Sequence, residues 1–336
     1  MLTGGLGYIG SHTATVLVGA GHELVIIDNL VNAKVEVKEH LEAITQKPVH
    51  FIQADVRDTD QLTKALKQHG IEAVIHFAGL KAVGESVTKP VDYYDNNIIG
   101  TISLLKAMQA ADTKTLVFSS SATVYGEPRY LPLDEAHPTS ATNPYGRSKL
   151  HIEEMLKDLS VSDPDWCIAC LRYFNPVGAH PSGLIGEDPN DIPNNLMPFI
   201  ARVATGELDK LNVFGNDYET KDGTGVRDYI HVMDLAEGHR DALSFLQEQQ
   251  GWHAINLGTG NGYSVLEMIQ AFEAASGQAI AYQISDRRPG DVASCYAKAE
   301  KAPALLGWTA TRSLQDMCAS TWHFQKQKRG TTPVDK

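Results

Sequence analysis

The sequence predicts an α/β fold in which a doubly wound parallel sheet is followed by a smaller C-terminal α/β domain. Three observations lead to this prediction. The chain opens with a glycine-rich turn at Gly4, Gly7 and Gly10 that runs into an apolar helix pattern. Short apolar runs of strand type then alternate with helical patterns through the first half of the chain. At 336 residues, the chain is also long enough to bury a large core and to form two domains.

Composition limits the classes of partner. The chain has 43% hydrophobic and 21% charged residues, which is typical of a globular protein. Its formal net charge of -12 argues against nucleic acid or an anionic membrane surface as the main partner. Four cysteines give no disulfide framework, and no apolar run has the length of a membrane span. No signal peptide precedes the first motif, so we expect a cytoplasmic protein.

The glycine loop and the strand after it predict a dinucleotide site. Glycine lets the backbone approach a pyrophosphate closely, and the helix that follows turns its positive end toward the phosphates. Residues 24–27 then form a buried-strand run that ends in Asp28, 18 residues beyond Gly10. An acid in this position accepts from a ribose 2′-hydroxyl and repels a 2′-phosphate. The sequence therefore predicts a Rossmann-type domain that binds NAD rather than NADP.

The first strand of this domain is unusually short. Only Met1 and Leu2 precede the loop, whereas the first strand of a dinucleotide-binding sheet lies centrally and strands usually have about five or six residues. We therefore expect a weakened central strand. Restoring a few apolar residues before it should raise the melting temperature.

Strand and helix patterns continue in alternation. The apolar runs at 49–52 and 73–79 read as strands with a helical pattern between them. A long helical pattern covers 90–111, and the next strand begins at 115–118. Parallel strands of this kind place their ligands at their carboxyl ends. Three residues fall at such ends: Asp55, Phe77 and Gly79.

A candidate proton-transfer group follows. Residues 119–126 open with three serines at the end of that strand, where a hydroxyl such as that of Ser121 could hydrogen-bond a reacting oxygen. Tyr145 and Lys149 are one helical turn apart in a pattern that continues to Leu159. An ammonium one turn away stabilises a phenolate and lowers the pKa of the phenol from its usual value near 10. This spacing alone is common, but together with the dinucleotide loop it predicts a catalytic base.

These features together resemble the extended short-chain dehydrogenase/reductase superfamily. Within that superfamily, three contiguous blocks at residues 75–86, 172–179 and 225–232 are similar to the UDP-glucose 4-epimerase (UDP-galactose 4-epimerase) family. The resemblance runs from Thr3 to the helix near Trp322, which is nearly the whole chain. Blocks of this length are not a chance match.

The resemblance implies two domains and a reaction. The implied domains are a seven-stranded NAD-binding Rossmann domain at 1–175, with a returning segment near 228–258, and a smaller UDP-sugar-binding domain at 176–330. The implied reaction is the reversible epimerisation of UDP-glucose and UDP-galactose at C4 through a 4-keto sugar. NAD would stay tightly bound and be recycled within each turnover. Because the cofactor is the electron sink, no metal is expected.

The resemblance also assigns roles to individual residues. Tyr145 is the implied base, Lys149 is its electrostatic partner and a ribose ligand, and Ser121 shares the sugar oxygen. The implied cofactor contacts are Gly4, Gly7, Tyr8, Ile9, Gly10, Asp28, Asn29, Asn32, Asp55, Val56, Phe77, Ala78, Gly79, Lys81, Asn96, Ser119, Tyr145, Lys149 and Tyr173. The implied substrate contacts are Lys81, Ser121, Ala122, Thr123, Phe174, Asn175, Asn195, Leu196, Val213, Phe214, Arg227, Arg288, Asp291 and Cys295.

Some of these substrate contacts also follow from residue chemistry. Arg227 and Arg288 suit a diphosphate, because a guanidinium matches phosphate oxygens bidentately. A surface ion pair is the simpler explanation for either arginine alone, and it suits Arg287 better than Arg288. The run at 193–198 begins a helix whose free N–H groups could hold the diphosphate as well.

Other interpretations stay open from the sequence. The Cys-x-x-Cys of Cys167 and Cys170 lies in a continuous apolar run, which favours packing in a buried strand over metal or redox chemistry. Sugar-nucleotide 4,6-dehydratases carry an Asp-Glu pair directly after the active-site hydroxyl, where this chain has Ala122 and Thr123. A dehydratase is therefore the second choice. A dehydrogenase that releases NADH and a non-catalytic NAD-binding sensor are further alternatives, although the retained catalytic set argues against a sensor.

One residue bears on substrate range. Cys295 stands where epimerases restricted to glucose and galactose tend to carry a bulky Tyr against the C2 substituent of the sugar. A small side chain leaves room for an N-acetyl group, so we expect UDP-GlcNAc and UDP-GalNAc to be interconverted too. The family also implies a homodimer through the helices near 90–111 and 145–159. The expected partners are UDP-hexoses, with no nucleic acid and no membrane.

Overall fold

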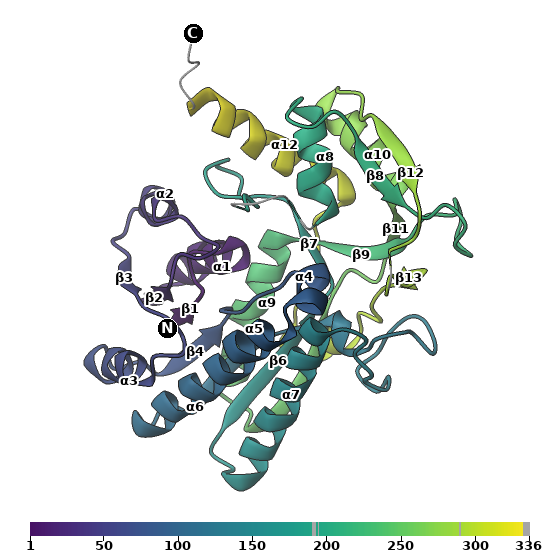
Figure 1. Cartoon of the computed structure of the whole chain (residues 1–336). Helices are drawn as coiled ribbons and strands as arrows, with labels where there is room; N and C mark the ends of the chain where they lie inside the picture. Colours follow the sequence, from purple (N-terminus) through teal and green to yellow (C-terminus); the bar gives the residue numbers. More distant parts are fainter. Residues whose placement is uncertain (190–192, 194, 289, 332–336) are drawn as a thin grey trace.

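The computed structural model describes residues 1–189, 193, 195–288 and 290–331. At its centre lies a seven-stranded parallel sheet, which confirms the predicted α/β fold (Figure 1). In spatial order its strands are β10 (Gly251–Leu257), β6 (Cys167–Tyr173), β5 (Thr115–Ser121), β4 (Ala73–His76), β1 (Leu2–Thr3), β2 (Val25–Asp28) and β3 (His50–Gln53). The carboxyl ends of these strands all meet at one edge of the sheet, because the strands are parallel.

The central strand β1 is as short as expected. It has two residues, yet it lies between β2 and β4 in the middle of the sheet. Leu2 pairs with Ile26 on one side and with Ile75 on the other. The Thr3 hydroxyl lies 2.6 Å from Nδ1 of His76, and both side chains are buried. A buried side-chain hydrogen bond thus adds to the few backbone bonds that two residues can make.

Helices cover both faces of the sheet. On one face, Leu17, Leu41 and Leu235 share an apolar cluster with the sheet, and on the other face Leu66 and Leu156 do the same. This arrangement is the doubly wound pattern that the strand and helix alternation predicts. The first face carries α1 (Tyr8–Gly19), α2 (Glu36–Thr45) and α9 (Val232–Phe245), and the second carries α3 (Thr59–Gln68), α6 (Gly100–Ala110) and α7 (Pro144–Ser162).

The long helical pattern at 90–111 is interrupted by a π-helical segment. Asn97 lies in this segment and is buried. Its side-chain oxygen accepts from Leu80 N at 2.8 Å, and its amide donates to Ser148 Oγ at 3.0 Å. The wider turn therefore ties the loop after β4 to α7, which fits the frequent occurrence of π segments at functional sites. The elements here are α4 (Val83–Thr88), α5 (Pro90–Tyr93), the π segment η1 (Tyr94–Ile99) and α6.

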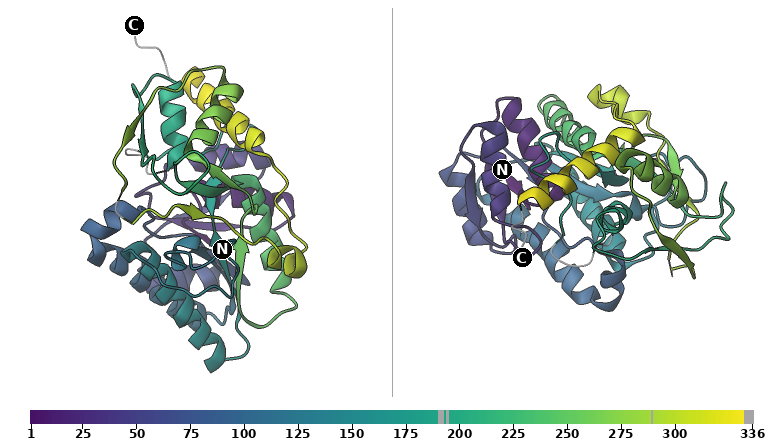
Figure 2. Two further views of the ribbon diagram at one scale, coloured as in Figure 1. Left: turned by 90° about the vertical axis from the view of Figure 1, so that its right-hand side faces the viewer. Right: turned by 90° about the horizontal axis from the view of Figure 1, so that it is seen from above.

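The C-terminal elements form a second layered unit beside the large sheet (Figure 2). β9 lies between β11 and β13 and also pairs with β7, while β12 pairs with β8. Met197, Phe272 and Met317 belong to its apolar core. No helix in the described part of the chain combines the length and apolar character of a membrane span. The remaining elements are η2 (Ala122–Val124), β7 (Asn175–Val177), α8 (Leu196–Ala204), β8 (Leu211–Phe214), β9 (Val226–His231), β11 (Gly262–Ser264), α10 (Val265–Ser276), β12 (Tyr282–Ser285), β13 (Ser294–Cys295), α11 (Lys301–Leu306) and α12 (Leu314–Thr331).

Candidate active site

Most of the sequence-predicted residues meet in one cavity of about 580 Å³. It opens at the carboxyl ends of the parallel strands, and its volume lies in the usual range for ligand and cofactor sites. The predicted residues that line it are Gly4, Gly7, Tyr8, Ile9, Gly10, Asp28, Asn29, Asn32, Val56, Phe77, Ala78, Gly79, Lys81, Asn96, Ser119, Ser121, Thr123, Tyr145, Lys149, Tyr173, Phe174, Asn175 and Asn195.

The glycine loop has the shape that close approach of a phosphate needs. Gly4 has a φ of +66°, and a Cβ there would lie 2.7 Å from Ala78 N. A Cβ on Gly10 would lie 2.6 Å from Gly4 O. Gly7 caps α1 without a side chain, so the first N–H groups of the helix are left for a ligand. These features fit a dinucleotide pyrophosphate at the helix N-terminus.

The carboxylate of Asp28 is held in place at the end of β2. Its Oδ2 accepts from Leu6 N at 3.1 Å, and its Oδ1 accepts from Leu30 N at 2.9 Å. Burial raises the pKa of this carboxyl, and the two backbone hydrogen bonds oppose that effect. Each oxygen keeps a second lone pair, so the group can still accept from the hydroxyls of a ribose.

Asp55 does not lie on the cavity wall. Its carboxylate accepts from Arg57 Nε at 2.8 Å and from Asn29 Nδ2 at 3.1 Å. The hydrogen bond from Arg57 holds the pKa of Asp55 well below its usual range. Asn29 and Val56 line the cavity instead. Asp55 thereby orients Asn29 beside the cavity, and its own predicted contact with the cofactor stays a prediction.

The predicted proton-transfer residues converge at the start of α7. Asn143 caps this helix and accepts from Gly146 N at 2.8 Å, which fixes the turn that carries Tyr145. Lys149 is buried, and its Nζ donates to Ser119 O at 2.6 Å. The same Nζ lies 6.0 Å from the ring centroid of Tyr145. Ser121 also faces the cavity, so the hydroxyl, phenol and ammonium lie together.

Burial shifts the pKa values of this group. Burial raises the pKa of Tyr145, and a hydrogen bond with Ser121 opposes it. Burial lowers the pKa of Lys149 to about 8, although Cys170 and Glu153 oppose that change. Desolvation is therefore the larger effect on the phenol in the protein by itself. An additional positive charge is needed to make Tyr145 a base at neutral pH.

A second group of predicted substrate residues lies on the C-terminal unit, apart from the residues that line the cavity. Asp291 Oδ2 accepts from Arg288 Nε at 2.9 Å, while Asp291 Oδ1 lies 3.9 Å from Arg227 Nη2. The guanidinium of Arg288 stacks 4.8 Å above the ring of Phe214. Cys295 pairs with Arg227 in the β13–β9 register. Two cations and an aromatic ring therefore lie together, as a nucleotide diphosphate would require.

Three other predicted substrate residues stand outside the cavity wall. Val213 is 1% exposed in the apolar core of the C-terminal unit, so its side chain is not available to a ligand. Leu196 begins α8 and packs partly against the same core. In the predicted run at 193–198, Asn194 lies outside the described residues. Ala122 is buried in η2. Arg287 pairs with Asp217 at 2.7 Å, which fits the surface ion pair that the sequence favours for it.

The sequence did not identify two acidic residues that close one side of the cavity. Glu187 Oε1 accepts from Asn195 Nδ2 at 2.6 Å and from Lys81 Nζ at 3.1 Å. Asp188 accepts from Lys34 Nζ and from Lys328 Nζ, both at 2.6 Å. No spacing or motif marks these two residues, because their partners lie far away in the chain.

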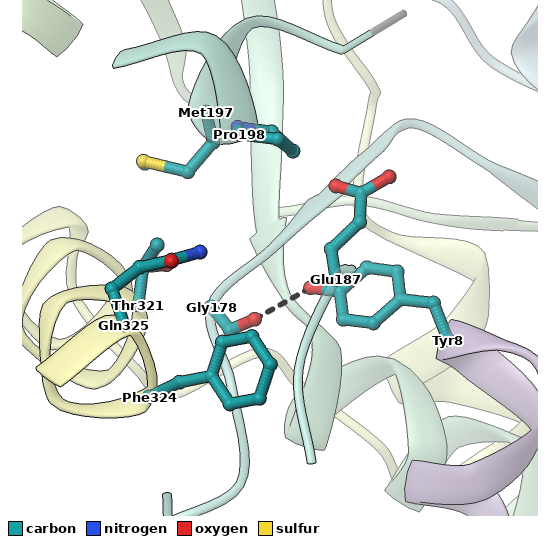
Figure 3. A pocket seen from close by; sticks show the side chains of 8 residues that line it. All are labelled: Tyr8, Gly178, Glu187, Met197, Pro198, Thr321, Phe324 and Gln325. Atoms are coloured by element: carbon teal, nitrogen blue, oxygen red, sulfur yellow. Dashed lines mark hydrogen bonds between the residues drawn. The ribbon is translucent and has the colours of Figure 1, made fainter. Parts of the chain in front are cut away.

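Glu187 also borders a small second cavity of about 10 Å³ (Figure 3). There the Tyr8 hydroxyl donates to Gly178 O at 2.7 Å, so the first turn of α1 contacts the segment that follows β7. Met197 and Phe324 close the space from α8 and α12. The glycine loop and the C-terminal unit are thus joined beside the large cavity.

Comparison with known proteins identifies the family. A family model described as GDP-mannose 4,6 dehydratase matches residues 1–321. UDP-glucose 4-epimerase of Bacillus subtilis is 56% identical over 325 residues, which cover 97% of this chain and 96% of that protein. The chain belongs to the UDP-glucose 4-epimerase family.

Solved structures of this family share the fold. UDP-glucose 4-epimerase from Stenotrophomonas maltophila, solved with bound NAD and formylated UDP-arabinopyranose, matches with a TM-score of 0.96 and 51% identity. The alignment covers 98% of both chains. The enzyme from Bifidobacterium longum, in complex with NAD+ and UDP, matches with a TM-score of 0.95 and 52% identity over 98% of this chain and 99% of that one. The epimerase family shares the extended short-chain dehydrogenase/reductase fold that the sequence resembles.

Two further observations bear on the chemistry of this family member. Ala122 and Thr123 stand after Ser121, so the chain lacks the acid pair of a 4,6-dehydratase although the family model carries that description. Among the described residues, no group of three or more histidine, cysteine or acidic side chains could hold a metal ion.

Proposed function

We propose that this protein is an NAD-dependent UDP-glucose 4-epimerase, which interconverts UDP-glucose and UDP-galactose at C4 through a 4-keto sugar. The observation that carries the proposal is the meeting of Ser121, Tyr145 and Lys149 at the wall of a cavity whose glycine loop fits a dinucleotide. Relatives of the same name at 56% identity support it. In this proposal the seven-stranded part holds NAD, and the C-terminal part holds the UDP-sugar.

The side chains have separate roles in proton transfer. The Tyr145 side chain, as the phenolate, takes the proton of the sugar 4-hydroxyl and becomes the phenol, which later returns that proton, so the reaction needs no net acid or base. The Ser121 hydroxyl hydrogen-bonds the same sugar oxygen, and Lys149 keeps its ammonium on the Ser119 carbonyl. NAD, when bound, supplies the hydride acceptor and a positive charge that favours the phenolate. Asp28, Asn29 and the glycine loop would hold it.

The substrate would be held by the second group of residues. Arg227 and Arg288 offer guanidinium groups to the diphosphate, and the Phe214 ring offers a flat apolar surface to the base. Asp291 would then release one of its contacts to the arginines. The size of Cys295 supports an extension of the proposal to UDP-GlcNAc and UDP-GalNAc, because the side chain leaves space beside the C2 substituent.

We propose a homodimer for this protein. Large apolar side chains stand exposed on α5 and η1, within the helical stretch near 90–111 where the resemblance implies the subunit contact, and on the preceding α4. Sedimentation velocity would detect a monomer, which would contradict this part of the proposal. The exposed residues are Val83, Val87, Val91 and Ile99. A cytoplasmic location also belongs to the proposal and agrees with four free cysteines.

A coupled assay with UDP-glucose, UDP-galactose, UDP-GlcNAc and UDP-GalNAc tests the function, read alongside the NAD content of the purified protein. We expect interconversion within each epimer pair without added NAD, because the cofactor is regenerated in each turnover. Release of NADH in proportion to substrate would instead indicate a dehydrogenase. Loss of water from the sugar would indicate a dehydratase, and NAD binding without turnover would indicate a sensor.

A further inference from the structure

A buried ion pair lies directly behind the candidate catalytic residues. Glu153 is 2% exposed and stands one helical turn after Lys149 on α7. Tyr145, Lys149 and Glu153 therefore follow each other along one face of the helix. Arg172 of β6, which is 4% exposed, is the partner of Glu153. The proposed mechanism assigns no role to either residue.

The geometry of the pair is bidentate and well satisfied. Arg172 Nε donates to Glu153 Oε1 at 3.0 Å, and Arg172 Nη2 donates to Glu153 Oε2 at 2.6 Å. Arg172 Nη1 donates to the Tyr125 hydroxyl at 3.1 Å. Burial lowers the pKa of Arg172, but the hydrogen bond and charge of Glu153 raise it above its ordinary value. Arg172 is thus held as a cation against the Glu153 carboxyl in the interior, where charges interact strongly.

The pair is connected to the active site through one serine. The Ser120 hydroxyl donates to Glu153 Oε1 at 2.5 Å. Ser120 stands between Ser119, whose carbonyl accepts the ammonium of Lys149, and Ser121. Glu153 therefore holds the end of β5 at the point where the strand presents both groups.

We propose that Glu153 and Arg172 form a positioning element for the epimerase reaction, an inference that rests on the proposed function. Glu153 fixes the strand end that carries Ser119 and Ser121. Its charge, balanced by that of Arg172, sets the electrostatic field in which the phenol and the ammonium titrate.

The titratable groups beside Tyr145 and Lys149 are neutral at pH 7, so the local field there depends on the charges of Glu153 and Arg172. Burial lowers the pKa of Lys149, and Cys170 and then Glu153 oppose that change. Burial lowers the pKa of the neighbouring histidine to about 3 and raises the pKa of the neighbouring tyrosines and cysteine, so all of them are neutral at pH 7. The neutral groups that face Lys149 or Tyr145 are His76 on β4, Tyr93 on α5, and Cys170 and Tyr173 on β6.

The test is the pH profile of kcat/KM for variants that break the pair from opposite sides. Glu153→Gln leaves Arg172 as an uncompensated cation, which lowers the pKa of both Tyr145 and Lys149, so the profile moves to lower pH. Arg172→Gln leaves an uncompensated anion, so the profile moves to higher pH. Glu153 lies one helical turn from Lys149 and two from Tyr145, about 6 and 12 Å along the axis, so a unit charge at an effective dielectric constant of about 20 gives a shift of about one to two pH units. The variant that combines Glu153→Gln with Arg172→Gln has no net charge at these two positions, as in the wild type, so its pH profile should return toward that of the wild type.

The opposite signs separate electrostatic control from a merely structural role. Loss of packing would lower activity in both single variants without moving the profiles in opposite directions, and that result would overturn the electrostatic half of the proposal. Ser120→Ala keeps both charges and tests the other half. It should lower kcat about five-fold at an unchanged pH profile, and a wild-type kcat would refute positioning. It also provides a result if a single charge variant fails to fold. A wild type without epimerase activity would instead count against the proposed function.

Discussion

At the residue scale, the structure separates the groups that move a proton from those that hold them. Tyr145 is the candidate base, yet burial raises its pKa in the protein by itself. Lys149 donates to a backbone carbonyl rather than to the phenol. The reactivity of Tyr145 therefore depends on what binds in the cavity, which links the proton transfer to cofactor occupancy.

We expect Tyr145→Phe to lower kcat about 10³-fold while the NAD content stays close to that of the wild type. The reason is that the substitution removes the one hydroxyl that exchanges a proton with the sugar, a role that contributes about 10² to 10⁴ in rate. Steady-state kinetics and the absorbance of released cofactor measure the two quantities. Tyr130→Phe is the matched control, because this exposed tyrosine hydrogen-bonds to Asp134 outside the cavity. Near-normal turnover by Tyr145→Phe would remove it as the base.

Cys295 is the residue that we expect to set the substrate range. Its thiol is half-buried, and burial raises its pKa to about 11, so it acts as a small neutral side chain. Cys295→Tyr should abolish turnover of UDP-GlcNAc and UDP-GalNAc by filling the space for the N-acetyl group, and should leave UDP-galactose turnover within about three-fold. Cys295→Ala serves as the control and should accept both pairs. Undiminished activity of Cys295→Tyr on the acetylated sugars would contradict the volume argument.

At the element scale, helix α7 links stability to catalysis, because its N-cap lies two residues before Tyr145. Asn143→Ala removes the acceptor for Gly146 N and should lower the free energy of unfolding by about 1 kcal/mol. It should also lower kcat about five-fold, since the first turn presents the phenol. Chemical denaturation and kinetics at saturating substrate measure the two effects.

Ser264→Ala provides the comparison for this prediction. Ser264 caps α10 in a capping box with Glu267, in the C-terminal unit. Its removal should cost about the same free energy of unfolding but leave kcat unchanged. Equal losses of kcat in the two variants would mean that the cap of α7 acts through general stability alone.

The elements were predictable from sequence where the chemistry is local. The apolar run before Asp28 and the helix after Asn143 are encoded by neighbouring residues, so their positions follow from periodicity and capping. The π turn that contains Asn97 was not predictable, because a π segment and an α-helix share nearly the same apolar pattern. The side-chain partners of Asp55 were not predictable for a different reason. A strand end predicts a position at the cavity edge, but not that Arg57 and Asn29 both donate to the carboxylate there.

At the scale of the whole molecule, some segments that are distant in the chain contact each other although no sequence pattern predicts the contact. Glu187 contacts Lys81 across 106 positions, and Asp188 contacts Lys34 and Lys328 across 154 and 140 positions. Such contacts depend on the packing of two units and leave no periodic signal. They nevertheless decide how the cavity is closed, because Lys34, Lys328 and both acids line it.

Asp188 should slow the release of NAD by tying the C-terminal helix to the loop after β2. Asp188→Asn removes two ion pairs whose side chains are partly exposed, so together they contribute about 1 kcal/mol. We expect NAD to dissociate about five-fold faster, as measured by exchange with labelled cofactor. Although burial raises the pKa of Asp188, its hydrogen bonds with the two lysines hold it below the usual range. The ion pairs therefore persist at neutral pH and are lost only as the pH falls through that lowered pKa.

Salt and a distant ion pair provide the controls for this last prediction. The difference between the wild type and Asp188→Asn should shrink as NaCl approaches about 1 M, because partly exposed charges are screened over about 3 Å at that concentration. Asp165→Asn removes a contact of Lys114 near the amino end of β6, away from the cavity, and should leave NAD release unchanged. A salt-independent difference would assign the effect to the shape of the segment rather than to its charges. Equal release from both variants and the wild type would show that the two ion pairs do not retain the cofactor.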